Sequence, residues 1–173
     1  MTSLILTLIG PDRPGLVEAL AGPIAAHGGN WLESRMAHLA GKFAGILRAE
    51  VPADRVDALV AVLGQLERQG LKVVVERDDV VAGAAQAHWV VELEGLDRPG
   101  LVHEISQVLA DRGVNIEELV TDRTTAPMSG EAIFRSRARI SVPPRADAAE
   151  LRARLERLAG DLMVQVSLEP PRS

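Results

Sequence analysis

Gly-Pro-Asp-Arg-Pro-Gly-Leu-Val at residues 10–17 returns as Gly-Leu-Asp-Arg-Pro-Gly-Leu-Val at residues 95–102. The two copies are 85 residues apart, and the same shift places Asn30 on Asn115. A repeat of this length is too long for the unit of a solenoid and suits a small domain. We therefore predict that a whole domain is duplicated in this chain of 173 residues.

The residues around the first copy predict a strand followed by a helix. An apolar strand at residues 4–9 ends in a Gly-Pro turn, and Pro14 stands where a helix can begin, because proline needs no N–H there. Apolar residues recur at helical spacing until the Gly28-Gly29 pair, which we expect to end the helix in a left-handed cap. Pro23 lies inside this run and is expected to kink or shorten the helix.

Beyond this helix the apolar period changes to two, which is typical of strands. Two strands, a helix ended by Gly70 and a last strand are predicted at residues 31–39, 43–51, 52–70 and 71–75. The second copy predicts the same order at residues 89–93, 99–112, 115–123, 133–142, 146–159 and 162–168. About eight extra residues of the second copy are expected near residues 124–131, as a longer loop between its middle strands.

A βαββαβ order with right-handed crossovers gives a four-stranded antiparallel sheet with both helices on one face. We therefore predict an α+β protein of two ferredoxin-like domains, at residues 1–78 and 88–173, with a linker at residues 79–87. The second face of each sheet needs a cover or a polar surface. The alternating arginines at 135, 137 and 139 are expected on that uncovered face, or in a contact with another subunit.

The composition excludes several kinds of site. Without cysteine, the chain cannot form a disulfide, a thiol nucleophile or a thiolate metal site. The net charge is −5 and neither half is a basic arm, which argues against direct nucleic-acid binding. No apolar run reaches the ~20 residues of a membrane span, and residues 1–4 lack the basic start of a secretion signal. A cytoplasmic protein without membrane contact is therefore expected.

Other sites hosted by this fold fit the chain poorly. RNA-recognition modules stack bases on exposed rings of their central strands, but the matched positions Phe43 and Ser136 do not keep a ring. Arg13 and Arg98 lie near the first helix of each copy, yet no glycine-rich run follows to cradle an acyl phosphate. The four histidines have no repeated position and no metal-ligand spacing, so we expect no metal site.

The repeated turn itself carries the candidate chemistry. The first amides of a helix have no partner within the helix, and with the helix dipole they favour a carboxylate. Glycine without a Cβ allows a ligand or a neighbouring backbone to approach closely. A carboxylate beside these free amides and an asparagine amide at the start of the next strand add polar groups. The turn residues Asp12 and Gly15, with Asn30, therefore favour an α-amino acid, as do Asp97, Gly100 and Asn115.

The same residues also fit a purely architectural role. Aspartate caps a helix, proline starts it and glycine relieves tight packing. The asparagines follow glycines and could serve as turn residues. The residues alone leave both interpretations open.

Both copies resemble ACT domains, small regulatory modules that bind amino acids, through Asp-Arg-Pro-Gly-Leu-Val and, after one helix, Gly-x-Asn. The resemblance covers nearly the whole chain. It implies ligand contacts at Asp12, Gly15, Leu16 and Asn30, and at Asp97, Gly100, Leu101 and Asn115. A tandem without an attached enzyme resembles the glycine cleavage system transcriptional repressor family, whose members are implied to regulate transcription through another protein.

Two functional hypotheses follow from these features. In the first, the chain is a non-enzymatic regulator without catalytic residues or cofactors, in which a bound amino acid changes how a partner regulatory protein is controlled. In the second, it is a constitutive interaction scaffold, or a regulatory subunit of an enzyme of amino-acid metabolism, without a ligand of its own. Exposed edge strands predict association in either case, as a homodimer.

Overall fold

The computed structural model describes residues 1–77, 87–144, 146–162 and 164–169. The chain divides into two compact units, residues 1–82 and 83–173, and each is described by itself. The predicted linker at residues 79–87 lies outside the described residues except for Ala87. That residue opens a strand and is not part of a linker.

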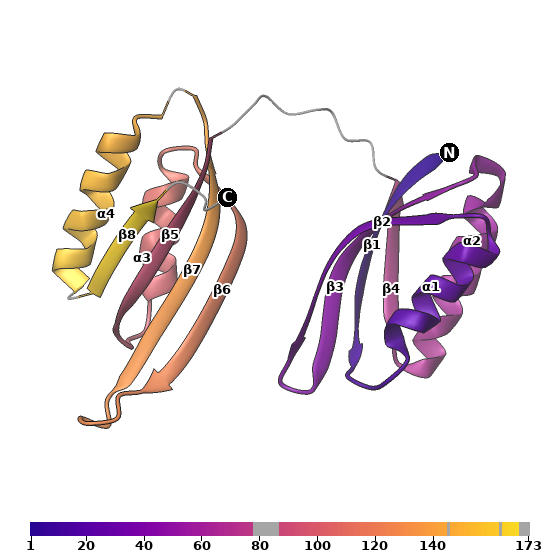
Figure 1. Ribbon diagram of the computed structural model, residues 1–173, viewed down its shortest axis with the longest axis horizontal. Helices are drawn as coiled ribbons and strands as arrows, with labels where there is room; N and C mark the ends of the chain where they lie inside the picture. Colours follow the sequence, from indigo (N-terminus) through magenta and orange to yellow (C-terminus); the bar gives the residue numbers. More distant parts are fainter. Residues whose placement is uncertain (78–86, 145, 163, 170–173) are drawn as a thin grey trace. The chain divides into compact units, whose positions relative to one another are not determined.

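The first domain has the predicted order of elements (Figure 1). Its strands form one antiparallel sheet in the order β2-β3-β1-β4, and both α-helices lie on the same side of it. The elements are β1 (Thr2–Pro11), α1 (Leu16–Ala26), β2 (Asn30–Leu39), β3 (Lys42–Val51), the short 3-10 helix η1 (Ala53–Arg55), α2 (Val56–Gln65), η2 (Leu66–Gln69) and β4 (Lys72–Arg77).

The second domain repeats this architecture in a sheet of order β6-β7-β5-β8. Its elements are β5 (Ala87–Leu96), α3 (Leu101–Ala110), β6 (Asn115–Thr125), β7 (Ala132–Val142), α4 (Ala148–Leu162) and β8 (Val164–Glu169). The α+β, ferredoxin-like prediction is therefore confirmed for both halves of the chain.

Each core lies between the helices and one face of the sheet. Alternation along β1 turns Leu4, Leu6 and Leu8 toward the helices, where all three are buried. Complete burial of one such side chain contributes roughly 1.5–3 kcal/mol. Each core also contains one of the two tryptophans of the chain, Trp31 in the first domain and Trp89 in the second.

The expected start of the first helix at Pro14 and its shortening at Pro23 are wrong, whereas a kink at Pro23 stays a prediction. The helix begins at Leu16, two residues after Pro14, because Gly15 before it adopts a left-handed conformation. It also contains Pro23 and continues to Ala26, so proline does not shorten it relative to α3. The expected left-handed cap is confirmed, because Gly28 has a φ of 71°.

The longer loop in the second domain is confirmed, although it contains fewer extra residues than expected. In the first domain a two-residue turn, Ala40-Gly41, joins β2 to β3 with positive φ at both positions. In the second, Thr125 pairs with Ala132, so residues 126–131 form the loop. The strand registers place six of the extra residues in this longer hairpin and the other two between β7 and α4.

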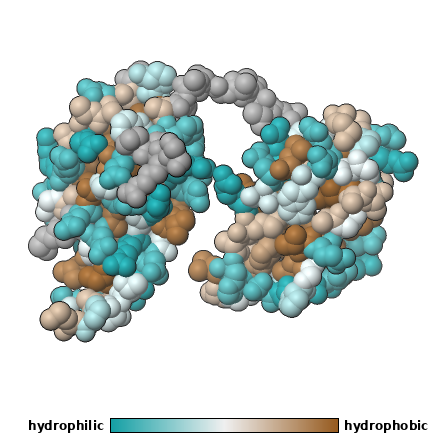
Figure 2. All heavy atoms as spheres, in the orientation of Figure 1, coloured by the Kyte–Doolittle hydropathy of each residue, from teal (hydrophilic) through white to brown (hydrophobic). Residues whose placement is uncertain are grey.

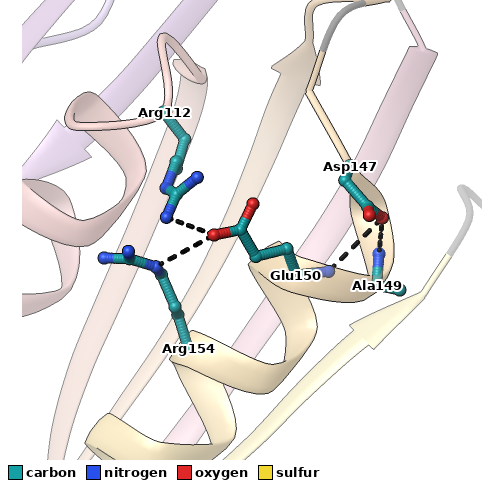
Figure 3. Close-up of polar contacts among 5 residues, drawn as sticks. All are labelled: Arg112, Asp147, Ala149, Glu150 and Arg154. Carbon is teal, nitrogen blue, oxygen red and sulfur yellow. Dashed lines mark hydrogen bonds and ion pairs between the residues drawn. The ribbon is translucent and has the colours of Figure 1, made fainter.

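Polar contacts fix the start of α4 and join it to α3 (Figure 3). The Asp147 carboxylate accepts hydrogen bonds from the amides of Ala149 and Glu150, at 2.8 and 3.4 Å, and so caps the helix. The Glu150 carboxylate in turn pairs with Arg112, just beyond α3, and with Arg154 one turn further along α4. Asp147 is therefore the residue that satisfies the free amides of this helix.

We predict that Asp147→Ala lowers the free energy of unfolding of the second domain by about 1 kcal/mol, because two helix amides lose their acceptor. Urea unfolding followed by Trp89 fluorescence in a Trp31→Phe background measures this domain alone. Glu156→Ala, which removes an exposed carboxylate from the same helix, is the matched control and should change stability little. Equal effects of the two substitutions would contradict the capping role.

Candidate functional site

The repeated turn passes from strand to helix through one glycine in a left-handed conformation. Gly15 has φ 90° and ψ 0°, and Gly100 has φ 95° and ψ −8°. The Gly15 carbonyl already accepts the first helical hydrogen bond, from the Ala19 amide. No side chain caps either helix, so the amides of the first turn are left for water or a ligand.

The turn of the first domain is open. An atom placed in the Cβ direction of Gly15 would meet nothing within 4 Å. The Asp12 amide donates to the Gly41 carbonyl, which ties the turn to the β2–β3 hairpin. The Asp12 side chain is 41% exposed, and its Oδ2 lies 3.7 Å from Nε2 of His38, at the end of β2.

His38 does not donate a hydrogen bond to this carboxylate. Its Nε2 accepts a hydrogen bond from the Gly41 amide at 3.3 Å, and its 3.7 Å separation from Asp12 Oδ2 is longer than a hydrogen bond. The Asp12 carboxylate therefore lies near the ring without being hydrogen-bonded to it.

Charged side chains of the protein itself lie beside the turn of the second domain. Arg123 Nε lies 2.6 Å from Asp97 Oδ2 and neutralises that carboxylate. Arg98 NH2 lies 2.9 Å from both oxygens of Glu104. One of these oxygens is 3.4 Å from where a Cβ on Gly100 would lie. A cation and a carboxylate of the chain itself therefore lie beside this turn.

The two turns differ at positions matched by the 85-residue shift. Arg123 takes the place of His38, and Glu104 takes the place of Ala19. None of these four residues was among the candidates predicted from the sequence. A position-by-position comparison of the two copies could have found these residues, since both differences lie beside the repeated motif in the folded domain.

The two predicted leucine contacts have buried side chains. Leu16 is 4% exposed and Leu101 is 2% exposed, and each packs in the core of its domain. Only the backbone amides of these residues can face a ligand. The apolar residue after the glycine therefore anchors the helix start to the core.

The predicted asparagines lie at the opposite end of the sheet. Asn30 and Ser3 both pair with Glu50, whereas Asp12 follows the far end of β1. Nine residues of strand separate the two levels, about 30 Å. The second domain has the same layout for Asn115 and Asp97. One amino acid cannot touch the aspartate and the asparagine of the same domain.

The arginines of β7 do lie on the uncovered face of the second sheet, as predicted. Arg135 Nε and Arg137 NH1 lie 2.8 and 3.3 Å from the carboxylates of Glu94 and Glu92 on β5. The hydrogen bond and the charge of Glu94 raise the pKa of the Arg135 guanidinium. These groups line a wide hollow of about 470 Å³ on that face.

Two further properties concern the described residues only. No group of three or more histidine, aspartate or glutamate side chains there is placed to hold a metal ion. None of the helices in that part of the chain has the length and apolar character needed to cross a membrane.

Comparison with known proteins gives one consistent match. An ACT domain model matches residues 2–76, and a second ACT domain model matches residues 89–160. The glycine cleavage system transcriptional repressor of Escherichia coli is 26% identical, over 95% of this chain and 88% of that protein. The phosphoserine phosphatase SerB2 of Mycobacterium tuberculosis is also 26% identical, but only 40% of its length is matched. A crystal structure of an unknown protein from Galdieria sulphuraria is 28% identical, with a TM-score of 0.88 over 99% of both chains.

We predict that Gly15→Ala destabilises the first domain by roughly 1–2 kcal/mol, because a Cβ is strained in the left-handed conformation. Gly64→Ala in α2 of the same domain, where a Cβ meets nothing within 4 Å, is the matched control and should stabilise by about 0.5–1 kcal/mol. Unfolding followed by Trp31 fluorescence in a Trp89→Phe background measures both. A neutral Gly15→Ala would show that the turn can adopt another backbone conformation.

Proposed function

This chain belongs to the ACT domain family, and we propose that it is a non-enzymatic regulator that binds a small amino acid and controls a partner protein. The process we propose is transcriptional regulation of amino-acid metabolism. Similarity to the E. coli repressor over nearly the whole length of both chains supports this assignment. The net charge of −5 favours control through a protein partner over direct contact with DNA.

The turn of the first domain is the proposed binding site. A ligand carboxylate would accept hydrogen bonds from the uncapped amides of residues 16–18, where the helix dipole favours negative charge. A ligand ammonium would pair with Asp12, whose carboxylate has no hydrogen-bonded cation. Gly15 leaves clearance for the atoms between the two ends. Together these groups recognise the part that all α-amino acids share.

The second turn provides the observation that carries this proposal. There, the Arg123 guanidinium forms an ion pair with the Asp97 carboxylate, and the carboxylate of Glu104 lies beside the helix start. Arg123 thus supplies the cation that a ligand ammonium would bring to the first turn, and Glu104, paired with Arg98, places a carboxylate near the helix start. This arrangement supports a ligand site in the first domain and a structural role for the second copy of the motif.

Regulation requires that the ligand bind one arrangement of the protein more tightly than another, because only differential affinity shifts an equilibrium. We propose that occupancy of the first turn selects the arrangement that the partner protein recognises. A cytoplasmic homodimer remains part of this proposal. Asn30 and Asn115 lie too far from the aspartates of their own domains to share that ligand, so we assign them no role in this contact.

We predict that isothermal titration with glycine, serine and the other amino acids finds one binding site per chain. Asp12→Asn should weaken the binding about tenfold or more, because the ammonium loses a charged partner. Asp97→Asn is the matched control and should leave the affinity unchanged, because Arg123 already occupies that carboxylate. Absence of heat and of any melting shift with every amino acid would reject the sensing function and favour a scaffold.

We predict that exchanging the two differing positions moves the site. His38→Arg together with Ala19→Glu should abolish binding at the first turn by supplying the charges found in the second. Arg123→His together with Glu104→Ala should open the second turn and raise the stoichiometry above that of the wild-type chain. Titration of both variants with the same amino acid, after circular dichroism has confirmed folding, makes the comparison. Unchanged binding in the first variant would contradict the assigned site.

A further inference from the structure

The face of the first sheet that carries no helix holds an apolar cluster beside the ion pair of Arg48 with Glu33. The strand registers place Ile46 of β3, Thr7 of β1 and Val74 of β4 in one row across the sheet. Ile9 lies in the next row. Ile9, Ile46 and Val74 are 49%, 52% and 45% exposed, so about half of each side chain faces solvent. Figure 2 shows hydrophobic residues on the surface among hydrophilic ones.

The corresponding face of the second sheet shows that the fold does not require apolar residues there. The registers match Ile46 with Arg137 and Thr7 with Glu92, and those two residues form an ion pair at 3.3 Å. Ile9 is matched by Glu94, which pairs with Arg135. Exposed apolar patches of this kind mark interaction surfaces, since their burial is favourable. The first sheet therefore has a surface to be covered, and the second does not.

We propose that a second copy of this chain covers the apolar face, with the two first-domain sheets packed face to face. This interface goes beyond the proposed amino-acid site and does not depend on it. The two copies are related by a two-fold axis that lies between the sheets, perpendicular to the strands, along the row that contains Ile46. It brings Ile46 against Ile46 of the partner subunit and Val74 against Val74 of the partner subunit. Aligned sheet packing of this kind buries the inner faces at a spacing of about 10 Å.

Charge on β4 favours this occupant and this orientation. Lys72 and Glu76 point to the same face of the strand on either side of Val74. They are four residues apart, about 13 Å along the strand, and so do not pair with each other. The two-fold axis reverses the strand direction in the second copy, so each Lys72 lies opposite Glu76 of the partner subunit. The two symmetric pairs at the rim fix the orientation of the copies. Arg35 of the edge strand β2 lies in the row of Ile46, so the axis brings it toward Arg35 of the partner subunit at the open rim, where water screens the two charges.

The main test is sedimentation equilibrium of the full chain over a wide range of concentration. The wild-type chain should dimerise, and Ile46→Arg should weaken dimerisation at least about a hundredfold, because it brings like charges together at the centre. Thr7→Glu with Ile46→Arg recreates the ion pair of the second sheet, so this double variant should fold and remain monomeric. Val60→Arg, an equal change on the exposed side of α2, is the control and should dimerise as the wild type does.

A charge exchange tests the orientation of the two copies. Lys72→Glu and Glu76→Lys should each weaken the dimer several-fold, and the chain carrying both substitutions should recover wild-type affinity, since the pairs are re-formed with reversed sign. A wild-type chain that stays monomeric, a dimer insensitive to Ile46→Arg, or a double exchange that fails to recover would each overturn the proposal. Amino-acid binding, measured separately, is expected to survive in all these variants.

Discussion

At Gly15 and Gly100 the backbone turns from strand to helix through a single residue of positive φ. Because that residue has no side chain, it cannot cap the helix, and no other side chain does so. The leucine that follows is buried and holds the helix against the sheet. Free amides at a fixed position are therefore a consequence of how each domain is built. The site, its charge preference and the difference between the two domains all depend on this turn.

Both copies keep the left-handed glycine turn, but the side chains around the turn differ between them. Asp12 and Asp97 occupy the same position, yet a histidine that accepts from a backbone amide lies beside one and an arginine that neutralises the carboxylate lies beside the other. Ion pairs also replace apolar contacts on the uncovered face of the second sheet. One domain is thus satisfied by its own side chains where the other presents a charge and an apolar surface. That difference suits a division into a responding and a supporting module.

The order of the elements and the core could be predicted from the sequence, because the periodicity of residues such as Leu4, Leu6 and Leu8 reports directly on burial. The first helix starts two residues later than the sequence predicts, since proline at position 14 suits a helix without requiring one there. The distance of Asn30 from Asp12 follows from the direction of β2, which starts at the end of the sheet away from the turn. Spacing in the sequence does not show this separation.

The partners of the aspartates could not be predicted, because His38 and Arg123 reach the turns only after β2 and β6 have run the length of the sheet. The position of Glu104 beside the second turn depends on a contact with Arg98 that exists only in the folded domain. Pairing across strands also explains Arg135 and Arg137 of β7, whose partners Glu94 and Glu92 lie more than 40 residues away along the chain. The motif can be found in the sequence, whereas the charged neighbours of each copy are set by the fold.

The central claim is that an amino acid binds the first turn and not the second. Backbone amide chemical shifts, followed by NMR while the amino acid that gives heat is added, test it residue by residue. We expect shifts concentrated at the amides of residues 16–18, with residues 101–103 unchanged. Shifts at both turns, or at the second turn alone, would contradict it.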